Sequence, residues 1–113
     1  MTPSEIVAFI QARRLSLSSE KAAQRDLDSE LAAAGIPYRR EVRLGRGDVI
    51  DFMVGGVGIE MKIKGQRREI YAQCARYCEH DVVEALVLAT NAAMGMPVTI
   101  NAKPVLIARL AWL

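Results

Sequence analysis

The stretch from Gly47 to Lys64, GDVIDFMVGGVGIEMKIK, constrains the fold of this chain more than any other. Apolar and polar residues alternate on both sides of Gly55-Gly56, and paired glycines between two alternating runs predict a tight β-hairpin. The stretch therefore predicts two antiparallel strands, around which the rest of the chain is organised.

The register of this hairpin places two acids close together. If the turn has two residues, Val54 pairs with Val57, and counting back along both strands places Asp51 opposite Glu60. Side chains on a strand repeat with period two, so Lys62 shares a face with Glu60. A four-residue loop would make the two acids diagonal neighbours on one face, and only an odd shift or a bulge would separate them. Both turns predict that two carboxylates and a lysine converge.

This convergence is unfavourable unless a cation relieves it. Directly opposed side chains lie roughly 4.5–5.5 Å apart at Cβ, where like charges repel. Mg²⁺ binds through one or two carboxylates, keeps several waters and takes up substrate phosphate. Asp51 and Glu60 are therefore candidate metal ligands. Lys62 could orient an attacking water or act as a base. A surface cluster of carboxylates and a lysine is the competing interpretation.

The same residues resemble the PD-(D/E)XK nuclease superfamily. Ile50-Asp51, a short turn and Glu60-Met61-Lys62 match its motif, with Ile50 in place of the proline of the family name. The expected order over Ser18 to Thr90 is helix, three strands, helix and strand, which matches the αβββαβ core of these enzymes. The resemblance implies an α/β, restriction-endonuclease-like fold in which helices flank a central mixed sheet.

The resemblance also implies further site residues. Glu20, near the start of the helix before the first strand, is placed like the additional helical carboxylate of the family, and Glu41 is a rival for that role. The main-chain carbonyl of Met61 is implied as a further ligand of Mg²⁺, for which Mn²⁺ would substitute. Gln73 and Tyr77 resemble a Q-x-x-x-Y signature, and their spacing places both on one helical face. Gln73 would position the catalytic lysine or contact the DNA backbone, and Tyr77 would do likewise or simply pack.

Basic residues gather around the hairpin, although the net charge of the whole chain is only +2. Residues 39–68 include eight basic and four acidic side chains. A positive surface around a carboxylate–metal site suits a phosphodiester backbone. The solvated face of an edge strand is the competing interpretation for each arginine taken alone. The expected nucleic-acid contacts are Lys64, Arg46, Arg67, Arg68 and Tyr77.

The remaining chain completes one domain, because 113 residues leave little room for a second. The patterns predict helices over 3–13, 18–35 and 67–80, strands over 38–44 and 84–90, and a closing hairpin over 98–110. The strand over 84–90 is a continuous apolar run and is expected to lie parallel to part of the hairpin. Cys74 and Cys78 are interpreted as core or helix-face residues, and Asp48 as structural.

The expected function is Mg²⁺-dependent hydrolysis of DNA by a structure- or end-directed endonuclease. Small members of the superfamily with this layout include junction resolvases and nucleases of phages or mobile elements, and a homodimer is one expectation. The alternative is a catalytically inactive nuclease fold that binds nucleic acid. A cytoplasmic location is expected, since no apolar run approaches the ~20 residues that a membrane-spanning helix needs.

Overall fold

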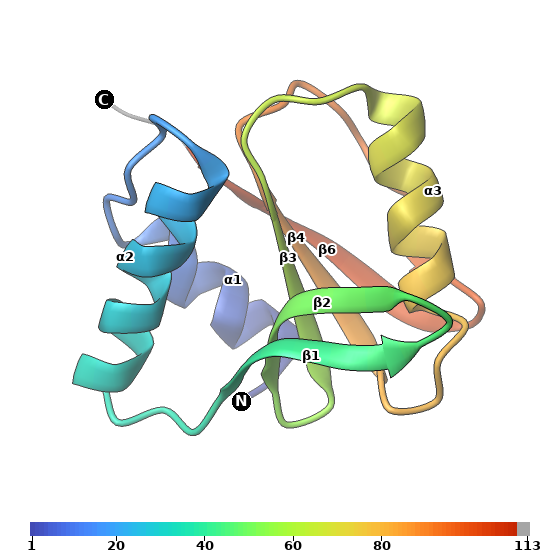
Figure 1. Cartoon of the computed structure of the whole chain (residues 1–113), viewed down its shortest axis with the longest axis horizontal. Helices are drawn as coiled ribbons and strands as arrows, with labels where there is room; N and C mark the ends of the chain where they lie inside the picture. Colours follow the sequence, from blue (N-terminus) through green and yellow to red (C-terminus); the bar gives the residue numbers. More distant parts are fainter. Residues whose placement is uncertain (111–113) are drawn as a thin grey trace.

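The computed structural model describes residues 1–110, which form a six-stranded mixed sheet and three helices (Figure 1). The sheet has the order β1-β2-β3-β4-β6-β5. The elements are α1 (Pro3–Gln11), α2 (Glu20–Ala33), β1 (Arg39–Gly45), β2 (Asp48–Val54), β3 (Val57–Lys62), α3 (Arg67–Tyr77), β4 (Ala85–Thr90), β5 (Thr99–Ile100) and β6 (Lys103–Arg109). None of these helices is long and apolar enough to cross a membrane.

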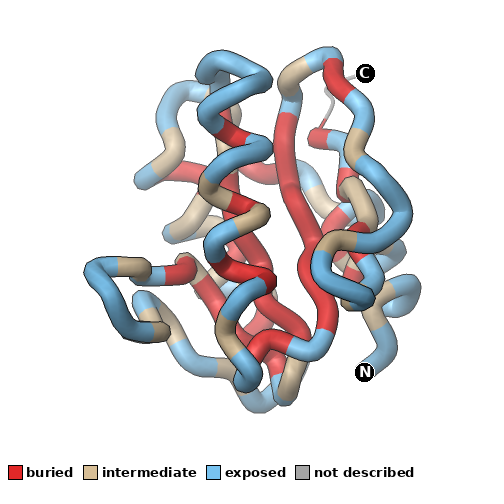
Figure 2. Tube along the Cα trace, turned by 90° about the vertical axis from the view of Figure 1, so that its right-hand side faces the viewer, coloured by how far each residue is buried: buried red, intermediate tan, exposed pale blue. Residues whose placement is uncertain are grey.

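The sheet has a hydrophobic cluster on each face. Helices α1 and α2 cover one face, and α3 covers the other (Figure 1). The first cluster includes Ile10 and Leu27 from the helices, and the second includes Cys74 from α3. Strand β4 is buried along its whole length, and the buried residues follow the central strands (Figure 2). Burial on both faces explains the unbroken apolar run of this strand.

Local signals in the sequence place the helices next to the sheet. The side chain of Ser19 accepts a hydrogen bond from the N–H of Ala22 and starts α2 immediately before Glu20. Two carbonyls that directly follow α3 are bound from the C-terminal hairpin. The side chain of Asn101 donates to the Cys78 carbonyl at 2.9 Å, and Lys103 Nζ donates to the His80 carbonyl at 2.7 Å. These bonds hold the segment that follows α3 against the hairpin of β5 and β6.

Of the two turn lengths predicted for the central hairpin, the two-residue turn is found, because Val54 pairs with Val57, but the pairing does not extend to Asp51 and Glu60. Strand β4 lies parallel to β3, and the C-terminal hairpin forms β5 and β6, as predicted. Strand β6 also pairs in parallel with β4 and so extends the sheet. The order from α2 to β4 is helix, three strands, helix and strand, as predicted, while its identification as a nuclease core stays a prediction.

The element boundaries differ slightly from those expected. The three helices end two to three residues earlier than predicted, at Gln11, Ala33 and Tyr77. For α2 the reason is Gly35, whose φ of +70° is left-handed and ends the helix. The single-domain prediction covered residues 1–113, of which 111–113 lie outside the described residues.

Candidate active site

Strands β2 and β3 separate where the two predicted acids lie. Their pairing stops at Phe52 and Ile59, although both strands continue beyond that point. In the opening, the N–H of Asp51 donates to Glu60 Oε1 at 3.2 Å. The N–H of Met61 donates to Asp51 Oδ2 at 2.8 Å. Each carboxylate thus binds an N–H of the other strand, and such bonds satisfy backbone groups that would otherwise lose a partner.

The opening changes the side-chain alternation of β2. Strict alternation would place Ile50 on the same face as Phe52 and Val54. Instead, Ile50 lies in the cluster under α3, whereas Phe52 and Val54 lie in the cluster under α1 and α2. The strand therefore changes face at Asp51, the residue between them. The local departure from regular pairing coincides with the candidate ligand.

Glu60 is almost completely buried, with 3% of its surface exposed. Burial raises its pKa to about 8, and the negative charge of Asp51 adds to this rise. The Tyr77 hydroxyl lies 3.1 Å from Glu60 Oε2 and 2.9 Å from the Val49 carbonyl oxygen. A hydroxyl has one proton, so protonated Glu60 can donate to Tyr77 while Tyr77 donates to Val49. This arrangement satisfies all three groups when Glu60 is neutral.

The pKa of the Asp51 carboxyl is also raised. Burial is the main cause that raises its pKa, and the charge of Glu20 raises it further, while the N–H of Met61 and the charge of Lys62 act in the opposite direction. Lys62 Nζ lies 3.7 Å from Glu60 Oε2, and about a fifth of its side chain is exposed. The convergence of Asp51, Glu60 and Lys62 is therefore present in the structure.

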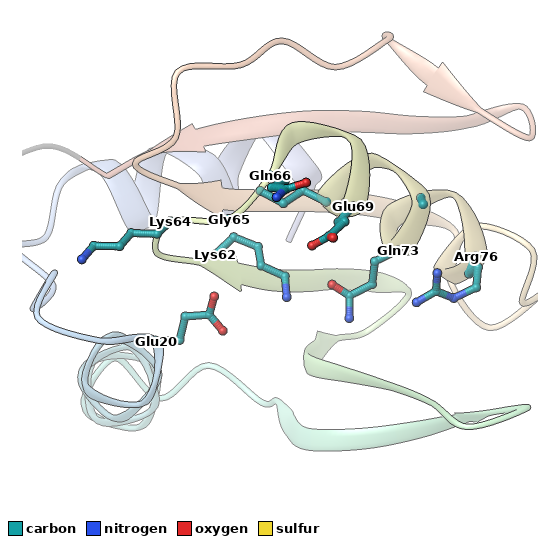
Figure 3. A pocket seen from close by; sticks show the side chains of 10 residues that line it. Glu20, Lys62, Lys64, Gly65, Gln66, Glu69, Gln73 and Arg76 are labelled. Carbon is teal, nitrogen blue, oxygen red and sulfur yellow. The ribbon is translucent and has the colours of Figure 1, made fainter.

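An open cavity of about 360 Å³ lies beside this cluster (Figure 3). Lys62 reaches it from β3, Glu20 from α2, and Gln73 from α3. Figure 3 shows the Glu20 carboxylate and the Gln73 amide pointing toward the Lys62 ammonium from opposite sides. Lys62 therefore lies between the carboxylates of Asp51 and Glu60 and the cavity. The full lining is Glu20, Lys62, Lys64, Gly65, Gln66, Glu69, Ile70, Ala72, Gln73 and Arg76.

The donor set fits a hard cation in part. Two neighbouring carboxylates, each with a raised pKa, provide the oxygen ligands and the negative charge that Mg²⁺ requires. Among residues 1–110, however, no three His, Cys, Asp or Glu side chains are grouped closely enough to hold a metal ion. Glu20 is therefore not grouped with Asp51 and Glu60 among the described residues, and its role as a metal ligand stays a prediction. The Met61 carbonyl stays a predicted ligand, and a role of Glu20 through water stays a hypothesis.

Several predicted contacts lie elsewhere. Tyr77 is 1% exposed and its hydroxyl is used inside the protein, so its prediction as a nucleic-acid contact is wrong. Arg46 lies in the turn between β1 and β2, and its nearest carboxylate is that of Glu79 at 3.6 Å. Arg67 and Arg68 are exposed in the first turn of α3, outside the cavity lining. Glu41 lines a separate hollow beside α2.

Sequence reasoning missed Arg76, which lines the cavity beside Gln73. The available signal was its spacing of three from Gln73, which places both side chains on one side of a helix. It also missed the contacts of Asp48, which binds both Arg76 and His80. These contacts join residues about thirty positions apart, and no local pattern could have predicted them.

Comparison of the chain with family models, curated proteins and solved structures finds no match. The resemblance to the PD-(D/E)XK superfamily therefore rests on the short motif and the order of elements. What the structure establishes is an α/β fold with a mixed sheet and helices on both faces.

Proposed function

We propose that this chain is a Mg²⁺-dependent nuclease that hydrolyses phosphodiester bonds of DNA, as a structure- or end-directed endonuclease related to the PD-(D/E)XK enzymes. One observation carries the proposal: the buried carboxylate of Glu60 and the half-buried carboxylate of Asp51 meet in an opening of the sheet, with a lysine between them and an open cavity. Buried acids with raised pKa values beside a cavity are typical of functional sites.

Asp51 and Glu60 would hold Mg²⁺ or Mn²⁺, and the bound cation would polarise a phosphate oxygen and lower the pKa of a water. Tyr77 and the N–H groups of Asp51 and Met61 fix both carboxylates against the backbone. Such fixed geometry favours catalysis because the ligands need no reorganisation during the reaction. Binding a cation would also replace the proton that Glu60 holds at neutral pH.

The lysine and the cavity side chains supply the remaining roles. Lys62 Nζ would orient the attacking water or accept its proton, since it lies at the boundary between the carboxylates and the cavity. The Gln73 amide would position Lys62 or bind a phosphate oxygen. Glu20 would act through water, because it faces Lys62 from α2 (Figure 3). Lys64 would contact a phosphate at the rim.

A nucleic-acid-binding module without catalysis is the second candidate. Within residues 1–110, no third His, Cys, Asp or Glu side chain is grouped with Asp51 and Glu60 to bind a metal ion, and this favours the second candidate. Calorimetry with Mg²⁺ and Mn²⁺ separates the two candidates. DNA affinity without any metal binding would support the module and contradict the nuclease.

The decisive test is a cleavage assay with four substrates: supercoiled plasmid, linear duplex, single strand and four-way junction. Each would be incubated with EDTA, Mg²⁺ or Mn²⁺. We expect metal-dependent cleavage that Lys62→Ala abolishes and Lys21→Ala retains, since Lys21 is exposed on α2 outside the cavity. Cleavage that survives both Lys62→Ala and Asp51→Ala would refute the proposed site, and the preferred substrate would identify the subclass.

A further inference from the structure

A guanidinium that no motif singled out lies at the rim of the cavity. Arg76 follows Gln73 by three residues on α3, roughly 4.5 Å along the helix axis. About half of its side chain is exposed, and Figure 3 shows its guanidinium on the side of the helix from which Gln73 also points. Arg76 is therefore presented to any molecule that extends along α3 from Lys62.

A hydrogen bond to Asp48 holds this guanidinium in a defined position. Its Nε donates to Asp48 Oδ1 at 3.2 Å, and the other carboxylate oxygen lies 2.9 Å from His80 Nε2. The side chains of Asp48 and His80 are only 12% and 11% exposed. Asp48 begins β2 and His80 follows α3, so the carboxylate is fixed by two elements of the fold. The exposed arginine is thus anchored to a largely buried pair.

The anchoring leaves the outer part of the guanidinium available. Within residues 1–110, Nε is the only guanidinium nitrogen of Arg76 that donates a hydrogen bond, and neither terminal nitrogen has a protein acceptor. The planar fork of an arginine matches a phosphate with two parallel N–H groups. The arginine side of this ion pair is half exposed, so solvent screens it and its contribution to stability is modest. The arrangement is therefore better explained by orientation of the guanidinium than by stabilisation of the fold.

We propose that Arg76 binds a phosphate next to the scissile one, and that Asp48 and His80 are positioning residues that aim its guanidinium. The inference deepens the proposed nuclease function and rests on it. It gives the nucleic acid a direction across the protein, from Lys62 along α3, past Gln73, to Arg76. Recognition along this path is of the sugar–phosphate backbone, which suits an enzyme that reads the shape of its substrate.

The test measures DNA affinity without hydrolysis. Variants are made in a Glu60→Gln background, in which an isosteric neutral group replaces the carboxylate, and are titrated with fluorescein-labelled single-stranded and duplex DNA. Arg76→Gln should weaken binding about tenfold, the value of a hydrogen bond to a charged group. It should also reduce the slope of log K against log salt by about 0.7–0.9, one phosphate contact. Arg43→Gln, on the exposed edge strand β1, removes the same charge away from the cavity as the control.

Asp48→Ala separates positioning from simple electrostatics. Removal of a negative charge near a polyanion should tighten binding if only charge matters, whereas loss of the anchor for Arg76 should weaken it. We expect weakening in the presence of Arg76 and none in an Arg76→Gln background, the non-additivity that marks two residues acting together. Asp48→Asn retains a hydrogen-bond acceptor for Nε and should keep the affinity.

Three results would overturn the inference. One is equal affinity for Arg76→Gln and the Arg43→Gln control, and another is tighter binding by Asp48→Ala. The third is the same loss from Asp48→Ala with and without Arg76, because that loss would reflect a general structural defect. Absence of DNA binding by the parent itself would instead contradict the proposed function, and the inference would fail with it.

Discussion

The substitution Glu60→Gln tests the electrostatics of the sheet opening through the pH dependence of stability. Burial and the charge of Asp51 raise the pKa of Glu60 from 4.5 to about 8 in the folded protein. Between these values the folded protein holds a proton that the unfolded chain has released. The free energy of unfolding of the metal-free protein must therefore fall as pH rises through this window. Most carboxylates in proteins have the opposite effect, since their pKa is lowered by folding.

The size of the effect follows from the shift. One proton changes the free energy of unfolding by at most about 1.4 kcal/mol per pH unit. Between about pH 6 and 8 the total is roughly 2 kcal/mol, because the slope decreases as the upper pKa is approached. With an unfolding entropy of roughly 2.1 cal/mol/K per residue, this loss lowers the Tm of a chain this size by about 8–10 °C. Asp51 and Glu60 interact, so the proton belongs to the pair.

The assay is thermal unfolding in EDTA at several pH values between about 6 and 8. The parent should lose stability across this range, and Glu60→Gln should lose much less, because glutamine has no proton to release. Glu69→Gln, an exposed glutamate on α3, is the matched control and should decline with the parent. Parallel declines of the parent and Glu60→Gln would refute the reasoning, since the pH dependence would then come from other groups.

Three other substitutions test separate parts of the structure. At about pH 8, Mg²⁺ at a hundred times its Kd should raise the free energy of unfolding of the parent by about 2.7 kcal/mol, and its Tm accordingly. The Tm of Asp51→Asn should not change, and an equal rise in both proteins would exclude Asp51 as a ligand. Tyr77→Phe removes the hydroxyl that donates to the Val49 carbonyl and pairs with Glu60, and should cost about 1–3 kcal/mol in urea unfolding; a neutral result would contradict the hydrogen bonds described. Ala102 has a φ of +63° in the turn before β6, so Ala102→Gly should stabilise the protein by about 0.5–1 kcal/mol, and a lower Tm would show that the turn is not strained.

The central hairpin could be predicted because its information is local. Period-two alternation and the paired glycines determine which residues face each other, so the pairing of Val54 with Val57 brought Asp51 next to Glu60. The separation of the strands at this point was not predictable. It arises because each carboxylate binds an N–H of the other strand, a bond that no alternation pattern contains.

The cavity was predicted only in part, because its walls come from distant segments. Glu20 and Gln73 were implied by the resemblance to the nuclease superfamily, whereas Arg76 carried no motif. Tyr77 shares the helical spacing of the buried residues Ile70 and Cys74 as well as that of Gln73, so the sequence left open whether its side chain packs or contacts DNA. The depth of a side chain depends on how α3 packs against the sheet, and a spacing of four residues leaves that depth open.

The bonds that hold the end of α3 have a consequence during protein synthesis. Asn101 and Lys103 bind the carbonyls of Cys78 and His80, and they emerge from the ribosome after every residue that lines the cavity. Until they arrive, the helix that carries Gln73 has neither its C-terminal anchor nor the neighbouring strand β6. A nascent chain would therefore expose its carboxylates and lysine before they are correctly spaced. The proposed cleavage activity would then appear late, at about the time when the domain can fold as a unit.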